Sequence, residues 1–460
     1  MTPECPTPDL RIEELGPRKI TSPARASRFI SDTEKTLYET RWPASQGDVK
    51  AFELGGPRRR IYFDPTKTRC GVVTCGGLCP GLNDVIRAIV LELYHTYGVR
   101  TIYGFRYGFE GLIPGYRHEA HMLDPDAVAD IHRLGGSVLA SSRGPQSPEE
   151  MVDALERLSI QVLFCIGGDG TFRGALAINE AVRRRNLKIS VVAVPKTIDN
   201  DVPFTARTFG FETAYSIAAD AIRGAHVEAQ GAFNGIGLVK LMGRHAGFIA
   251  AHAVLASREA NFLLVPEVEF ELHGNNGFLA HLYRRLLARR HAVVVVAEGA
   301  GQNLVREDHA ESELKDPSGN VRLKDIGLFL QERIREYFRL MNVPITLKYI
   351  DPGYLIRSAP ATASDSLFAG ILGQMAVHAG MAGKTGMFVG YWNDCFTHVP
   401  IAAAVSRNKR LDPNGNLWQS ALASTGQPRQ MVNRSDADET DPAAPLLNRP
   451  DPADPLAVVP

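Results

Sequence analysis

Two aspartates stand two residues apart in the polar segment 196–201, which reads Lys-Thr-Ile-Asp-Asn-Asp and follows the apolar run 189–194. In such a pair, Asp199 and Asp201 can divide the work, one accepting a proton while the other organises a metal ion or neighbouring groups. Lys196 and Thr197 can stabilise the charge that develops on a phosphoryl group in transfer. A solvated loop without chemistry is the alternative. We interpret the segment as a catalytic loop.

A glycine-rich segment at residues 74–83 could cradle a polyphosphate. It contains Gly76, Gly77 and Gly81 and precedes an apolar helical stretch from Val85. Glycines let backbone amides approach phosphates, and the amino end of a helix favours negative charge. A simple tight turn remains the alternative.

A second glycine-rich segment, residues 164–171, follows another apolar run and carries polar side chains. Gly168 and Gly170 flank Asp169, whose oxygens suit Mg²⁺ on nucleotide phosphates, and Thr171 offers a hydroxyl. The alternative is an aspartate whose side chain only forms a hydrogen bond with the backbone of its own turn. In a third segment, residues 134–144, Arg143 beside Gly144 could fork onto phosphate oxygens or be an ordinary surface cation.

The sequence pattern predicts alternating strands and helices on either side of these loops. Apolar or β-branched runs end in glycine or proline and precede helical stretches, which predicts parallel α/β units. Unbroken apolar runs are typical of strands covered on both faces. We predict strands at residues 69–74, 161–166, 189–194, 236–241, 292–297 and 386–391. Ligands collect beyond the carboxyl ends of such strands, where the polar loops lie.

Composition limits the classes of protein that fit. The chain has 460 residues, which is more than a single hydrophobic core usually supports. Its basic and acidic residues are equal in number (51 each), so the chain has no net charge that would attract nucleic acid or an anionic membrane. Without a long apolar stretch or a signal-peptide pattern, we predict a cytoplasmic protein that binds neither nucleic acid nor membrane. The 6 cysteines are too sparse for a disulfide scaffold, and Cys75 with Cys79 lacks a matching pair for zinc.

The ends of the chain differ from its centre. Residues 1–66 are rich in proline and charge, and we predict an extension or arm. Residues 435–460 repeat Asp-Pro and Ala-Pro steps, which predict a disordered tail.

The motifs together resemble the 6-phosphofructokinase family. Its Gly-Gly-Asp-Gly loop, Thr-Ile-Asp-Asn-Asp loop and Met-Gly-Arg motif match Gly167–Gly170, Thr197–Asp201 and Met242–Arg244 in order, over roughly residues 69–401. The resemblance implies an α/β fold of two Rossmann-like three-layer lobes with mostly parallel sheets and the active site in the cleft between them. The implied lobes are residues 67–210 with 356–405 for the nucleotide and 211–355 for the sugar phosphate, followed by a helical or irregular segment at 406–434.

The resemblance also implies a reaction, in which Mg²⁺-bound ATP phosphorylates the 1-hydroxyl of fructose 6-phosphate, the committing step of glycolysis. Asp199 would be the base, assisted by Lys196, Thr197 and Arg244. The implied nucleotide or metal residues are Gly76, Gly77, Arg143, Gly144, Gly168, Asp169, Gly170 and Thr171, with Asp169 as the metal ligand. The implied sugar-phosphate residues are Thr197, Ile198, Asp199, Met242, Gly243, Arg244, Glu298, Lys348, Tyr354, Leu355, Ile356 and Arg357. The family implies a homo-oligomer, either dimer or tetramer.

Several positions depart from many bacterial relatives. Leu78 replaces an aspartate and Tyr354 a histidine, Gly235 and Lys348 stand where arginines reach a neighbouring subunit's substrate, and Leu91 replaces an effector-binding arginine. These features resemble the plant, protist and some bacterial branch, which includes pyrophosphate users. Cross-subunit substrate binding and the bacterial effector mode are therefore open.

Donor choice depends on Gly170. Pyrophosphate enzymes resemble this chain at Lys196 but have aspartate at the position of Gly170, where a carboxylate would repel the nucleotide's α-phosphate. We therefore predict ATP, with a pyrophosphate-dependent enzyme as the first alternative. A non-catalytic sugar-phosphate sensor is the second, although Asp169 and Asp199 are both retained. An NAD or lipid kinase is disfavoured because those families lack the motifs around Asp199 and Arg244.

Overall fold

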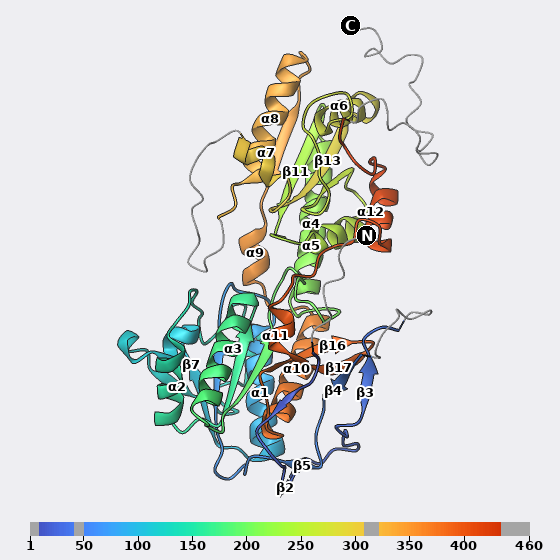
Figure 1. Ribbon diagram of the computed structural model, residues 1–460. Helices are drawn as coiled ribbons and strands as arrows, with labels where there is room; N and C mark the ends of the chain where they lie inside the picture. Colours follow the sequence, from blue (N-terminus) through green and yellow to red (C-terminus); the bar gives the residue numbers. More distant parts are fainter. Residues whose placement is uncertain (1–8, 41–49, 308–321, 434–460) are drawn as a thin grey trace.

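Two β-sheets organise the chain into two lobes (Figure 1). The computed structural model describes residues 9–40, 50–307 and 322–433. The predicted tail at 435–460 and Cys5 lie outside these residues. All the predicted strands are confirmed, with ends shifted by at most one residue.

The larger sheet has nine strands, and its centre is parallel. In spatial order the strands are β3 (Lys35–Leu37), β4 (Ala51–Leu54), β17 (Cys395–Pro400), β16 (Met387–Trp392), β10 (Ser190–Pro195), β9 (Val162–Gly167), β6 (Arg69–Thr74), β7 (Thr101–Phe105) and β8 (Ala120–Met122). Strands β16, β10, β9, β6 and β7 pair in parallel, whereas every pairing outside them is antiparallel. The expectation of mostly parallel sheets therefore holds for the centre of this sheet, and its edges are antiparallel. The cause at one edge is the β16–β17 hairpin, whose two-residue turn, Asn393-Asp394, has the positive φ angles that favour tight hairpins.

Alternate residues of the central strands pack on opposite faces of this sheet. Val162, Phe164 and Ile166 of β9 join the core under α1 (Leu82–Leu91) and α10 (Ala363–Met381). Leu163 and Cys165 join the core under α2 (Pro148–Arg157) and α3 (Asp169–Arg184). This double burial explains why β9 is apolar throughout.

The smaller sheet has four strands and is parallel throughout. Its order is β12 (Phe262–Leu264), β13 (His291–Ala297), β11 (Gly235–Leu241) and β14 (Thr346–Ile350). One face packs on α4 (Phe211–Gln230) and α5 (Phe248–Ser257), and the other on α6 (Phe278–Arg289) and α8 (Ile326–Leu340). The α4 and α5 side shares one continuous apolar core with α1 and α10 of the other lobe, which fixes the lobes against each other.

Shorter elements connect these layers. Helix α12 (Asn416–Thr425) packs on α5 and β12 of the smaller-sheet lobe. The connecting elements are β15 (Lys384–Thr385), α7 (Gln302–Glu307), α9 (Gly353–Ser358), α11 (Ile401–Ala404), α12 (Asn416–Thr425), the π-helical turn η1 (Glu92–Tyr97), and the 3₁₀ turns η2 (Gly108–Leu112), η3 (Pro114–Tyr116) and η4 (Ile131–Arg133).

The described part of the amino-terminal segment packs along the larger-sheet lobe. Strands β3 and β4 extend the nine-stranded sheet, β1 (Glu13–Glu14) pairs with β15, and β2 (Ile20–Thr21) pairs with β5 (Arg60–Ile61). Strands of two to four residues carry no sequence period, so their pairing could not be expected from residues 1–66 alone.

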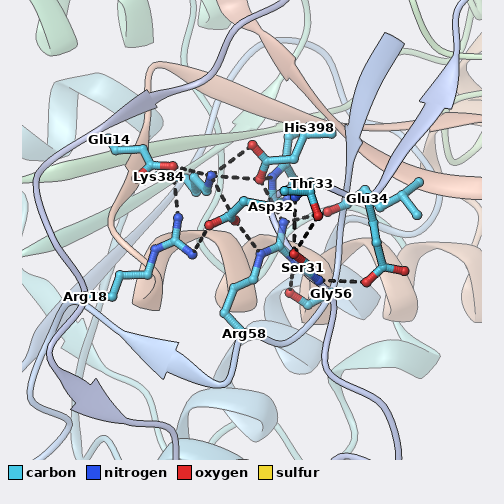
Figure 2. A network of polar contacts seen from close by, with 12 residues as sticks. Glu14, Arg18, Ser31, Asp32, Thr33, Glu34, Gly56, Arg58, Lys384 and His398 are labelled. Carbon is cyan, nitrogen blue, oxygen red and sulfur yellow. Dashed lines mark hydrogen bonds and ion pairs between the residues drawn. The ribbon is translucent and has the colours of Figure 1, made fainter.

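A buried ionic network fastens this segment to the lobe (Figure 2). The fully buried ammonium of Lys384 lies 2.6 Å from Glu14, 2.8 Å from Glu53 and 3.4 Å from Asp32. Arg58 and Arg18 complete the network, with Arg58 2.7 Å from Glu53 and Arg18 2.7 Å from Asp32. Three carboxylates thus face three permanent cations, and Lys384 takes the place that a metal ion would occupy among the carboxylates.

The network holds its central carboxylate ionised. Burial alone would raise the pKa of Glu53, but the hydrogen bond with His398 and the charge of Lys384 hold that pKa far below its usual range. Removing the central lysine should therefore be costly, since the carboxylates would lose the charge that balances them.

Candidate functional site

The first glycine-rich loop leads from β6 to α1 and brings two cations close to its backbone. The Gly76 amide donates to the carbonyl of Ser142 at 2.9 Å, so the loop lies beside the segment that carries Arg143. A Cβ on Gly76 would lie 3.1 Å from Nζ of Lys196, and one on Gly77 would lie 3.1 Å from Nη2 of Arg143. Gly76 also has a φ of +84°. Glycine is needed here because the cations and the turn leave little room for a side chain.

The second glycine-rich loop leads from β9 into α3, which begins at Asp169. Thr171 is buried against Gly167, and its hydroxyl bonds to the thiol of Cys75 rather than standing free. A Cβ on Gly170 would meet open space. Gly168 and Gly170 therefore leave the amino end of a sixteen-residue helix accessible to an anion.

Asp169 is about half exposed, and its partner in this structure is Arg173, one helical turn along. The Arg173 Nε and Nη2 atoms lie 3.2 and 3.1 Å from the Asp169 carboxylate. Arg173 was missed in the sequence analysis, although the i,i+4 spacing of opposite charges on a helix is a usable signal. An accessible carboxylate at the end of a phosphate loop fits the donor chemistry that Mg²⁺ requires.

The catalytic loop begins where β10 ends and is tied to the donor loops. The backbone N–H of Lys196 donates to the carbonyl of Gly167 at 2.9 Å, and its Nζ donates to the carbonyl of Gly77 at 2.7 Å. Lys196 is buried, and this burial lowers the pKa of its ammonium. The lysine is therefore placed between both glycine-rich loops.

Thr197 organises the two aspartates. Its hydroxyl donates to Asp201 Oδ1 at 2.8 Å and accepts from the backbone N–H of Asp199 at 3.2 Å. Asp201 is therefore engaged with Thr197, while the role of Asp199 as the base stays a prediction.

Asp199 lies where residues of both lobes meet. Its Oδ1 is buried and has no hydrogen-bond partner among the described residues, while its carboxylate accepts a hydrogen bond from the backbone N–H of Arg244. Loss of water, followed by the charges of Asp201 and Glu298, raises the pKa of Asp199 to about 8, against the opposing charge of Arg357. A carboxylate with this pKa is a competent base near neutral pH.

The smaller-sheet lobe supplies the other side of the site from the ends of β11 and β13. Gly243, with a φ of +130°, turns the chain after β11, and its N-terminal neighbour Met242 contacts Arg357 through Sδ to Nε at 3.3 Å. The N–H of Glu298, the first residue after β13, donates to the carbonyl of Leu241 at 2.8 Å. The predicted residues Met242, Arg244, Glu298 and Arg357 are thereby brought around Asp199, with Ile198 packed in the core behind the loop.

Three predicted sugar-phosphate residues have exposed side chains in the single chain. Lys348 on β14 is exposed, and Tyr354 and Leu355 on α9 are 86% and 72% exposed, whereas Ile356 is buried. The departure at Gly235 has a clear cause, because a Cβ there would lie 2.0 Å from the carbonyl oxygen of Ala229. An arginine cannot be accommodated at that point of β11.

Lys409 is a second residue that the sequence analysis missed. Its backbone N–H donates to the carbonyl of Asp201 at 2.9 Å, and its Nζ donates to the carbonyls of Thr205 at 3.1 Å and Ala206 at 2.8 Å. Lys409 therefore holds the end of the catalytic loop and the residues that follow it, although it is about 200 residues away in sequence. No local motif marks it.

No helix in residues 9–40, 50–307 and 322–433 is long and apolar enough to cross a membrane.

Comparison with known proteins identifies the family of this chain. The family model described as phosphofructokinase matches residues 69–380. The ATP-dependent 6-phosphofructokinase of Borreliella burgdorferi is 49% identical over 441 residues, which cover 92% of this chain and 98% of that protein. That of Amycolatopsis methanolica is 46% identical over 442 residues, covering 92% and 95%.

The solved structure of a pyrophosphate-dependent phosphofructokinase from Marinobacter aquaeolei matches with a TM-score of 0.64 and 20% identity, covering 80% of this chain and 94% of that one. At that identity it shows the shared fold alone. The chain belongs to the phosphofructokinase family, as its motifs predict. Within the family, it is 43–49% identical to proteins named ATP-dependent 6-phosphofructokinase in bacteria, plants and protists.

Proposed function

We propose that this chain is an ATP-dependent 6-phosphofructokinase whose catalytic base is Asp199, acting in the cleft between the two lobes. The observation that carries the assignment is the unpartnered Oδ1 of Asp199, which lies between the donor loops of one lobe and Arg244 and Glu298 of the other. Production of fructose 1,6-bisphosphate, followed in a coupled assay with ATP and with pyrophosphate in parallel, tests the activity directly.

The donor side binds the nucleotide phosphates. Backbone amides of the loops at Gly76–Gly77 and Gly168–Thr171 approach the phosphates, with Arg143 and Gly144 at the edge of the first loop. Asp169 would hold Mg²⁺, which neutralises phosphate charge when bound. Arg173 would then release the Asp169 carboxylate, with which it pairs in this structure.

The acceptor side orients the sugar phosphate. Arg244 and Arg357 pair with anionic oxygens, Glu298 accepts from sugar hydroxyls, and Thr197 with Met242 and Gly243 lines the position of the reacting alcohol. Asp199 removes the proton from the 1-hydroxyl of the sugar. At the same time the hydroxyl oxygen bonds to the γ-phosphorus of ATP. The bond from that phosphorus to the bridging oxygen breaks, and ADP leaves. Lys196 and Arg244 stabilise the charge on the phosphoryl group in transfer.

Gly170 underlies the choice of ATP. Replacing Gly170 with aspartate places a carboxylate in the open space beside the first turn of α3, where it would repel the α-phosphate. We expect Gly170→Asp to lower kcat/KM for ATP by about 10- to 100-fold, the effect of roughly 1.4–2.7 kcal/mol. Steady-state kinetics with varied ATP measures the change.

Gly170→Asn is the matched control, because it adds nearly the same volume without the charge and should cost much less. Equal losses in both variants, or unchanged ATP kinetics in Gly170→Asp, would contradict charge repulsion as the basis of donor selection.

The oligomeric form remains part of the proposal. The exposed side chains of Lys348, Tyr354 and Leu355 are available to a second copy of the chain, as expected if a dimer or tetramer completes the sugar-phosphate site. We keep the cytoplasmic location as a prediction. The alternative of a non-catalytic sugar-phosphate sensor requires an inactive site, and the retained pair Asp169 and Asp199 favours the enzyme.

A further inference from the structure

The segment between α11 and α12 crosses from the larger-sheet lobe to the smaller-sheet lobe (Figure 1). Helix α11 packs on α3 and β17 of the first lobe, and α12 packs on α5 and β12 of the second. On its way, this crossing segment passes the catalytic loop and the turn of residues 242–247, which we call the Met-Gly-Arg loop. It therefore contacts both halves of the candidate active site.

Lys409 fastens the crossing segment to the larger-sheet lobe. Its backbone N–H donates to the carbonyl of Asp201, and its ammonium donates to the carbonyls of Thr205 and Ala206. The same ammonium lies 5.2 Å from the ring centroid of Phe248, the first residue of α5. Because an ammonium is attracted to the face of an aromatic ring, Lys409 binds both lobes.

Glu267, which follows β12, joins the same segment to the smaller-sheet lobe. Its Oε1 accepts from the backbone N–H of Leu411 at 2.9 Å. Its Oε1 and Oε2 also accept from the backbone N–H of Gly247 at 3.0 and 3.1 Å. A Cβ on Gly247 would lie 3.1 Å from Oε2, so the chain runs close against the carboxylate. One carboxylate thus binds the crossing segment and the last residue of the Met-Gly-Arg loop.

The Met-Gly-Arg loop is held at both ends. At its start, the backbone N–H of Gly299 donates to the carbonyl of Gly243 at 3.1 Å. At its end, Glu267 accepts from the last backbone N–H. Arg244 lies between these two anchors, and its own backbone N–H donates to the carboxylate of Asp199. The position of that N–H therefore depends on the anchor that Glu267 supplies.

We propose that Glu267 is a positioning residue of this enzyme, which together with Lys409 and Leu411 forms a clamp that holds the Met-Gly-Arg loop against the catalytic loop. The clamp acts through backbone positions, because its hydrogen bonds to both loops are made with backbone groups. It keeps the Arg244 N–H in place at Asp199. This inference rests on the proposed function, in which Asp199 is the base.

Glu267→Leu removes both acceptor oxygens and keeps a similar side-chain volume. We expect it to lower kcat by about 10- to 100-fold, because a small displacement around the reacting groups costs this much. Glu267→Gln should stay within about fivefold of the parent enzyme, since Oε1 alone can accept from both N–H groups. Glu269→Leu, at an exposed glutamate two residues along the chain, is the matched control and should retain the parent kcat.

The pH dependence of kcat/KM for fructose 6-phosphate separates positioning from a general loss of structure. Besides burial, the groups that act on the carboxylate of Asp199 are the charged side chains of Asp201, Glu298 and Arg357 and the backbone N–H of Arg244. Losing the hydrogen bond from this N–H destabilises the ionised carboxylate and raises its pKa. The rise of the rate should therefore move to higher pH in Glu267→Leu and stay in place in Glu269→Leu. A lowered kcat with an unshifted profile would overturn the positioning role.

Amide hydrogen exchange, followed by mass spectrometry, tests the clamp without reference to the reaction. In Glu267→Leu, peptides that cover the Met-Gly-Arg loop and residues 197–206 should both exchange at least about fivefold faster than in the parent protein. The peptide of β9 should be unchanged. Lys409→Met loosens the clamp from the other lobe and should affect the same two peptides, which gives a second reading if Glu267→Leu does not fold.

The exchange result also separates the clamp from the proposed function. Faster exchange in the Met-Gly-Arg loop alone, or unchanged exchange in both peptides, would overturn the clamp whatever the reaction is. Full activity of Asp199→Asn would instead remove the base assignment, and the exchange of the two peptides would still decide whether Glu267 couples the loops.

Discussion

Asp199→Asn lowers kcat by about 100- to 10,000-fold while leaving KM for fructose 6-phosphate nearly unchanged, if the carboxylate is the general base. Asparagine keeps the shape and the hydrogen bond from the Arg244 backbone but cannot accept the proton of the 1-hydroxyl. The loss therefore appears in the transition state rather than in substrate binding. Initial rates in the coupled assay, with both substrates varied, separate the two parameters.

Asp412→Asn is a suitable control, because Asp412 lies in a turn of the carboxyl-terminal segment and its carboxylate accepts a hydrogen bond from the local backbone N–H of Asn414. It should retain near-normal kcat. Turnover of Asp199→Asn within a factor of about three of the parent enzyme would remove the base assignment, since general-base catalysis is worth far more.

Lys384→Met lowers the free energy of unfolding by about 3 kcal/mol, the low end for breaking a buried ion pair because Glu14 and Asp32 are partly solvated. Methionine fills a similar volume but leaves three carboxylates against Arg18 and Arg58. Urea denaturation followed by circular dichroism measures the change.

Two further variants make this result specific. Lys19→Met removes an exposed lysine from the amino-terminal segment that the network fastens and should change stability by less than about 0.5 kcal/mol. Adding Glu53→Gln to Lys384→Met restores the balance of charge and should recover part of the loss. Equal stability of Lys384→Met and Lys19→Met would show that the network does not fasten the segment.

The sequence was sufficient to predict the strands that consist of continuous apolar runs. The strands β9, β10 and β13 are buried on both faces, so their continuous apolar runs identify them within a residue. The short strands of the amino-terminal segment carry no such signal, and their antiparallel pairing depends on contacts such as Lys384 with Glu14, which are 370 residues apart.

The same contrast holds at the candidate site. The loops around Asp199, Asp169 and Arg244 are contiguous motifs, and the structure brings Asp199 and Arg244 into contact across the lobes. Lys409 acts on the catalytic loop only through tertiary structure, so nothing local identifies it. The exposure of Tyr354 also could not be predicted from the sequence, because it depends on the orientation of α9 after β14.

The most direct test of the central claim is the pH dependence of kcat/KM for fructose 6-phosphate in the parent enzyme and in Asp201→Asn. kcat/KM reports the free enzyme, in which burial and the charges of Asp201 and Glu298 raise the pKa of Asp199 to about 8. The base is active when ionised, so we predict a rate that rises with pH through this pKa. Removing the negative charge of Asp201 favours the ionised form and should move the rise to lower pH. A profile with no such rise, or one that Asp201→Asn leaves in place, would contradict Asp199 as the base.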